Sequence, residues 1–128
     1  MDILIWAIFI AVLLPFLAKI PVAIAMHRLN KYDNNNPRNQ QEQLTGYGAR
    51  ALAAHQNAFE SLIIFCPAVL LAIATNHTGE LIQQLAITYL IARIIYNVLY
   101  VLDFSTLRSI VWAISLFCSV YIIWLCIP

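Results

Sequence analysis

The chain has 128 residues, of which 62% are hydrophobic and only 10% are charged, whereas soluble globular domains have about 45–50% apolar and about 25% charged residues. A soluble domain of this length cannot bury so much apolar side chain, so the composition excludes an ordinary soluble protein and predicts an integral membrane protein. The net charge of +1 and the three cysteines, all within apolar stretches, exclude nucleic acid as a partner and predict neither a disulfide framework nor a metal site.

Four segments are apolar enough to cross a bilayer, which requires about 20 residues of helix. In chain order, we predict membrane-spanning helices at residues 3–26, 49–74, 81–102 and 106–127. The one long polar interval, residues 28–45, is rich in Asn and Gln and is predicted to be a hydrated loop without a helix. The other connections are short, so residues 1–128 are predicted to form a single all-α domain, an antiparallel bundle of four transmembrane helices.

The positions of the basic residues predict the orientation, because Lys and Arg are enriched in cytoplasmic loops. They flank the first and third connections: Arg28, Lys31, Arg38, Arg50 and Arg108. The second connection carries no basic residue. We therefore expect a multi-pass membrane protein whose polar loop is cytoplasmic and whose two termini are not, located in the inner membrane if the protein is bacterial.

Polar side chains interrupt the last three predicted helices at membrane depth, where an ionisable group costs about 2.5–3.5 kcal/mol on insertion scales. Helical spacing places them on one face of each helix: Arg50, Asn57 and Glu60 on the second, Arg93, Tyr96, Asn97 and Tyr100 on the third, and Arg108, Trp112 and Ser115 on the fourth. Because the helices alternate in direction, all three faces lie in the cytoplasmic half. The sequence therefore predicts a single polar chamber.

Two other interpretations stay open. In a structural subunit, Asn57 would hydrogen-bond a neighbouring helix and Glu60 would pair with Arg93. That interpretation does not explain why three separate helices each carry an arginine. In a small proton-coupled transporter, a carboxylate would be expected in the first helix, but Lys19 is the only ionisable residue between residues 3 and 26.

Three segments carry a resemblance to a known family. GYGARALAAHQNAFESLIIF, residues 46–65, resembles the second helix of the membrane-associated proteins in eicosanoid and glutathione metabolism, the MAPEG family. ARIIYNVLYVLDFSTLRSIVW, residues 92–112, is similar to the third helix, short connection and fourth-helix start of that family, and YDNNNPR, residues 32–38, resembles the first loop of bacterial members. The resemblance covers nearly the whole chain and is to members of the microsomal glutathione transferase type.

The resemblance implies a homotrimer that binds glutathione between adjacent subunits, near the cytoplasmic surface. It implies that Arg108 is catalytic because it stabilises the glutathione thiolate, and that the following residues bind glutathione: Arg50, Asn57, Glu60, Arg93, Tyr96, Tyr100 and Ser109. The charges suit the ligand, since arginines bind its carboxylates and an acid binds its amine. No metal is implied.

The reaction implied is attack of the glutathione thiolate on a lipophilic electrophile or hydroperoxide that enters from the membrane. The family includes transferases, peroxidases and a non-catalytic protein, so membership does not fix the activity. Better-known members have an arginine one turn before the asparagine, where this chain has Ala53. The alternative expectation is therefore a non-catalytic protein that binds glutathione or lipid.

Overall fold

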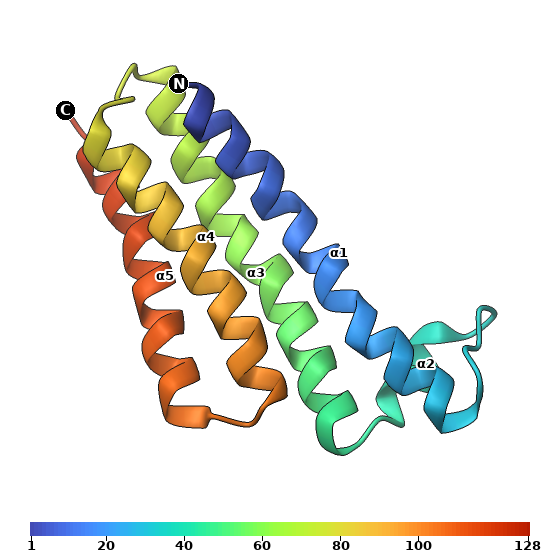
Figure 1. Cartoon of the computed structure of the whole chain (residues 1–128). Coiled ribbons are helices and arrows are strands. Elements are labelled where there is room, and N and C mark those ends of the chain that lie inside the picture. Colours follow the sequence, from blue (N-terminus) through green and yellow to red (C-terminus); the bar gives the residue numbers. More distant parts are fainter.

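The computed structural model describes all residues from 1 to 128, and every regular element in it is helical. The elements are α1 (Asp2–Asn30), α2 (Pro37–Glu42), α3 (Gly46–Ala74), α4 (Glu80–Val101) and α5 (Ser105–Leu125). Figure 1 shows the four long helices side by side and antiparallel, with the short α2 beside one end of α1. Each long helix is long and apolar enough to cross a membrane, so the predicted all-α membrane bundle is confirmed.

The bundle has two different ends. Both chain termini and the connection between α3 and α4 lie at one end, called here the terminal end (Figure 1). The polar loop with α2 and the turn between α4 and α5 lie at the other, called the loop end. The basic residues that flank the first and third connections are therefore gathered at one end of the molecule, as the sequence predicts.

Helices α3 and α4 lie at the centre of the packing. Each contacts the other three long helices, whereas α1 and α5 do not contact each other. The residues that α3 buries are mostly small, and they include Ala51, Ala54, Ala58, Ala68 and Ala72. Small side chains let helix backbones approach closely, which is the usual means of packing helices within a membrane.

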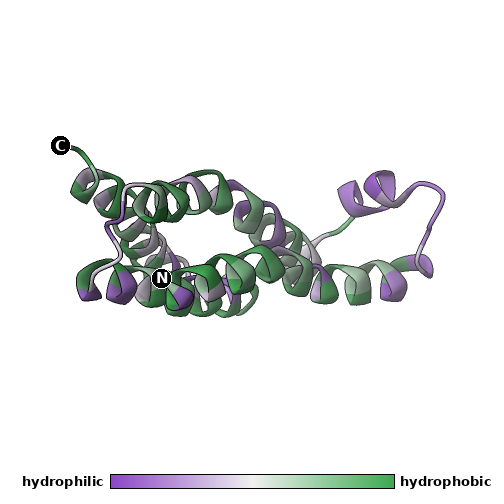
Figure 2. Cartoon of the chain, turned by 90° about the horizontal axis from the view of Figure 1, so that it is seen from above, coloured by the Kyte–Doolittle hydropathy of each residue, from purple (hydrophilic) through white to green (hydrophobic).

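The outer surface of the bundle is apolar, and the large apolar core is confined to one half. Residues such as Trp6, Phe16, Ile63 and Phe117 point outward, and Figure 2 shows hydrophobic colour along the helices and hydrophilic colour over α2 and its loop. The main buried apolar cluster lies in the terminal half, where Phe65 stacks on Tyr89 with ring centroids 3.7 Å apart. Towards the loop end, polar side chains occupy the space between α3, α4 and α5.

The polar interval differs from the prediction in two respects. Helix α1 continues to Asn30, four residues beyond its predicted end. Residues 37–42 form α2, so the prediction of a loop without a helix was wrong there. Pro37 begins α2, at a position where its fixed φ favours a helix start.

The side chain of Gln40 holds α2 in place. Its carbonyl oxygen accepts a hydrogen bond from the Asp33 backbone N–H at 2.9 Å, and its amide donates to the carbonyl oxygens of Met26 and Lys31. These bonds fasten the short helix to the C-terminal part of α1 and to the residues that follow it. The packing of one buried glutamine therefore determines the conformation of a segment whose composition is typical of a loop.

Candidate functional site

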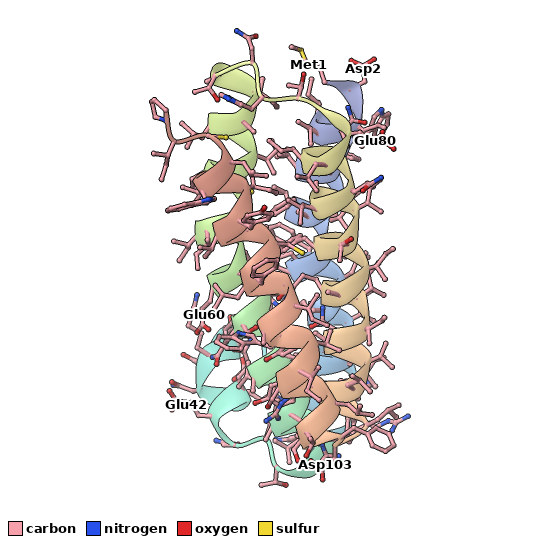
Figure 3. All side chains as sticks on the ribbon, turned by 90° about the vertical axis from the view of Figure 1, so that its left-hand side faces the viewer. Met1, Asp2, Glu42, Glu60, Glu80 and Asp103 are labelled. Atoms are coloured by element: carbon pink, nitrogen blue, oxygen red, sulfur yellow. The ribbon has the colours of Figure 1, made fainter.

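The candidate site lies between α3, α4 and α5, in the half of the bundle nearer the loop end. Its central residue is Arg93 of α4, which is only 1% exposed. Arg93 Nη2 donates to Asn57 Oδ1 on α3 at 2.7 Å, and Asn57 Nδ2 donates to Glu60 Oε2 at 3.1 Å. The two charged groups predicted to converge are thus linked through a neutral amide. Glu60 itself is exposed and lies in the loop half of the bundle (Figure 3).

The guanidinium of Arg93 is incompletely bonded. Its Nε and Nη1 atoms are buried and have no hydrogen-bond partner. Burying a charged group without partners is costly, and Arg93 is one of the residues that line a cavity of about 150 Å³. At about 30 Å³ per water in the liquid, this volume holds a few water molecules or one group the size of a carboxylate. Arg93 is thus positioned to bind an anionic group.

Hydroxyl groups line the deeper part of this cavity. Ser61 Oγ and Tyr89 Oη form a hydrogen bond of 2.6 Å between α3 and α4, and Ser115 and Ser119 of α5 complete the wall. Ser61, Tyr89 and Ser119 were not among the site residues predicted from the sequence. Helical spacing could have predicted two of them, because Ser61 follows Asn57 by four residues and Tyr89 precedes Arg93 by four, and residues four apart are neighbours on a helix.

An aromatic ladder connects Arg93 with Arg108. The Arg93 guanidinium carbon lies 4.1 Å from the centroid of the Tyr96 ring, and Tyr96 meets Tyr100 edge to face at 5.6 Å. The Arg108 guanidinium carbon lies 4.2 Å from the centroid of the Tyr100 ring. Contacts between a guanidinium and an aromatic face are attractive, so two tyrosines on successive turns of α4 each contact one of the two cations.

The Arg108 end of the ladder has a hollow of its own, of about 190 Å³. It is lined by Tyr96, Tyr100, Arg108, Ser109 and Trp112. Trp112 also lines the cavity at Arg93, and its side chain is 43% exposed. The two hollows therefore adjoin at this tryptophan, and together they contain Asn57, Glu60, Arg93, Tyr96, Tyr100, Arg108 and Ser109.

Two residues of the predicted chamber lie apart from these hollows. Arg50 lines neither of them, and its Nε donates to the Val101 carbonyl oxygen at the end of α4, at 3.3 Å. A cation there suits the C-terminal end of a helix, where the carbonyl groups lack intrahelical donors. Asn97 lines a separate apolar hollow beside α1. The sequence placed both residues on the correct helices but could not place them relative to neighbouring helices.

The side-chain types define what the two hollows can bind. No group of three His, Cys, Asp or Glu side chains comes together that could hold a metal ion. The groups present are guanidinium, amide, hydroxyl and indole N–H groups, with one exposed carboxylate. Such a set suits an extended ligand with anionic groups and one cationic group.

Comparison with known proteins gives one result. The model of the MAPEG family matches residues 3–128, which is nearly the whole chain. No curated protein and no solved structure matches. The matched residues include nearly all of the four apolar helices that are long enough to cross a membrane. The helices and the match to a family of membrane proteins therefore agree. The chain is an integral multi-pass membrane protein that belongs to the MAPEG family.

Proposed function

We propose that this protein is a glutathione-dependent membrane transferase or peroxidase. The proposal rests on Arg93, which lines a polar cavity. Its buried guanidinium has a neutral amide as its hydrogen-bond partner, and its Nε and Nη1 atoms have no partner. Glutathione has two carboxylates, and arginine forms paired hydrogen bonds with carboxylates. A carboxylate of glutathione bound in this cavity would complete the hydrogen bonding of Arg93.

The proposed ligand extends along the ladder from Arg93 to Arg108. One carboxylate lies at Arg93, the amino group faces Glu60, and the peptide runs past Tyr96 and Tyr100. The sulfur lies beside Arg108, in the hollow that Ser109 also lines. Asn57 orients Arg93 and is within reach of the ligand. We assign Arg50 a positioning role at the rim, because it bonds the end of α4, the helix that carries both tyrosines.

The proposed chemistry begins with the thiolate. A free thiol has a pKa of about 8.5 and is mostly protonated at neutral pH, and a nearby guanidinium favours the charged form. In transfer, the sulfur electron pair forms a C–S bond and the leaving group departs with its own pair. In peroxide reduction, the sulfur attacks the terminal oxygen, the O–O bond breaks, and the alkoxide takes a proton. The resulting sulfenic acid then reacts with a second glutathione to give the disulfide and water.

The second substrate is proposed to be a lipophilic molecule that enters from the bilayer. The partly exposed indole of Trp112 gives the two hollows an apolar side.

We further propose that the loop end is cytoplasmic, because basic residues gather there. We also propose that the protein is a homotrimer with glutathione bound between subunits. A bacterial protein of this kind would reside in the inner membrane.

One observation favours a second candidate function. Ala53 stands where better-known members have an arginine, so one carboxylate of glutathione lacks a partner that those members provide. A non-catalytic protein that binds glutathione or lipid would have the same fold and would keep Arg93. The two candidates differ in turnover and not in binding.

Turnover measurements on purified protein in liposomes distinguish the two candidates. The assay supplies reduced glutathione with 1-chloro-2,4-dinitrobenzene, or with cumene hydroperoxide. We expect wild-type turnover with at least one of these substrates, and a loss of about 10²-fold in Arg108→Ala, the size expected for removal of one group that stabilises developing charge. Arg38→Ala, in an exposed part of α2, is the matched control. Stabilisation by glutathione without turnover would support the non-catalytic candidate.

A further inference from the structure

A third hollow lies on the other side of α4, away from the candidate site. It has a volume of about 510 Å³ and lies between α1, α3 and α4 in the loop half of the bundle. Figure 1 shows this region, where α3 is visible between α1 and α4. It shares no lining residue with the hollows at Arg93 and Arg108, so the site already described does not account for it.

Small side chains create the hollow. Its floor is formed by Ala51 and Ala54 of α3, both buried, and Ala18 of α1 leaves space in one wall. The rims carry exposed apolar residues, including Leu17 and Val98, which are 57% and 53% exposed. In a membrane protein such a rim faces lipid, so the hollow is open to apolar molecules dissolved in the bilayer.

Asn97 is the only polar residue among those that line this hollow. Its Nδ2 donates to the Arg93 carbonyl oxygen at 3.1 Å, whereas its Oδ1 is buried and has no hydrogen-bond partner. A buried acceptor without a donor is unfavourable, especially in apolar surroundings where water is scarce. The acyl chain of a phospholipid has no donor to offer. The chemistry of the hollow therefore favours an apolar molecule with one hydrogen-bond donor.

We propose that this hollow binds a membrane lipophile with a single hydroxyl group, a long-chain or isoprenoid alcohol, whose hydroxyl donates to Asn97 Oδ1. Its chain would lie along Leu17 and Val98 and over the alanine floor. This site is separate from the one proposed for the lipophilic substrate, because α4 lies between the hollow and Arg108. The inference does not depend on the proposed glutathione chemistry.

Photolabelling of the full-length protein in liposomes tests the proposal. The probes are hexadecanol with a diazirine in its chain and the methyl ether of the same molecule, which lacks the donor. Peptide mass spectrometry locates the adducts. We expect the alcohol to label residues 14–21, 51–54 and 94–102 at least fivefold more than the ether does. In Asn97→Leu, labelling by the alcohol should fall to the level of the ether.

Two further variants complete the design. Gln84→Leu removes an exposed polar side chain from the same helix but outside the hollow, so the preference for the alcohol should be unchanged. Ala18→Phe fills the hollow from its α1 wall and should abolish labelling of these segments by both probes. If Asn97→Leu does not fold, the comparison of the two probes on the wild type still decides the question.

Three results would overturn the proposal. Equal labelling by alcohol and ether would show that the hollow takes any hydrocarbon chain. Labelling by the alcohol outside these segments would show that it binds elsewhere. Absence of labelling by either probe in the wild type would show that the hollow is covered in the membrane, for instance by a second copy of the chain.

Discussion

The amide of Asn57 occupies the place beside Arg93 where a carboxylate would neutralise the buried guanidinium. Arg93 Nη2 and Asn57 Oδ1 are 2.7 Å apart, and the nearest acid in this chain of hydrogen bonds, Glu60, bonds to the far side of the amide. An amide orients the guanidinium without cancelling its charge. Arg93 is therefore held in one position and retains its attraction for an anionic ligand.

Asn57→Asp tests whether the neutral partner matters. Aspartate has nearly the same shape but would give Arg93 an internal counter-ion, which competes with the carboxylate of the ligand. We expect glutathione to bind at least tenfold more weakly, whereas stability without glutathione should be unchanged or higher. Titration calorimetry in detergent measures the affinity. Equal affinity in the variant and the wild type would contradict the role assigned to the amide.

Arg93→Met tests whether Arg93 serves to bind glutathione or to stabilise the fold. Methionine is apolar and flexible enough to fill the space, and replacing a buried charge by an apolar residue is often neutral or stabilising. We expect the variant to unfold at the same or a higher temperature than the wild type without glutathione, and to show no stabilisation by glutathione. Thermal unfolding with and without the tripeptide measures both effects. A large loss of stability in the absence of ligand would indicate that Arg93 has a structural role.

Tyr100 positions Arg108 through its ring face. Removing the aromatic ring in Tyr100→Leu should lower glutathione-dependent turnover about 2- to 30-fold, since such a contact contributes about 0.5–2 kcal/mol. Tyr100→Phe keeps the ring and should stay within about twofold of the wild type. Equal losses in the two variants would mean that the hydroxyl group matters and that the stacking on Arg108 does not.

Gln40→Leu tests the anchor of α2. The variant removes three hydrogen bonds to the backbone of Asp33, Met26 and Lys31, each worth about 0.5–1.5 kcal/mol. We expect the segment between α1 and α3 to be cut rapidly by protease in intact liposomes, while the four long helices stay protected. Gln43→Leu, at an exposed position, is the control. Equal protease resistance in Gln40→Leu and the wild type would show that α2 is held by other contacts.

The sequence predicted the parts of the structure that depend on composition and local periodicity. The four helices follow from apolar length, and the faces of Asn57, Glu60, Arg93 and Tyr96 follow from helical spacing. Helix α2 was missed because Gln40 bonds to backbone groups of α1, and such contacts leave no local signal in the sequence.

The site was predicted less completely than the fold, for the same reason. Asn97 is one turn from Arg93 and was placed on its face, but a four-residue step turns the helix by about 40°, enough to direct Asn97 towards α1. Arg50 bonds to the end of α4, and only the packing of α3 against α4 determines that contact. The contacts of residues that lie between facing helices can be predicted only when the three-dimensional arrangement of those helices is known.

Thermal unfolding of the purified wild-type protein with and without reduced glutathione shows whether the protein binds this tripeptide. A ligand at about 100 times its dissociation constant adds about 2.7 kcal/mol to the free energy of unfolding. We predict a clear rise in unfolding temperature with millimolar glutathione, and the loss of this rise in Arg93→Met. No rise in the wild type at that concentration would contradict the proposed glutathione site, because the buried cation of Arg93 would then not serve to bind glutathione.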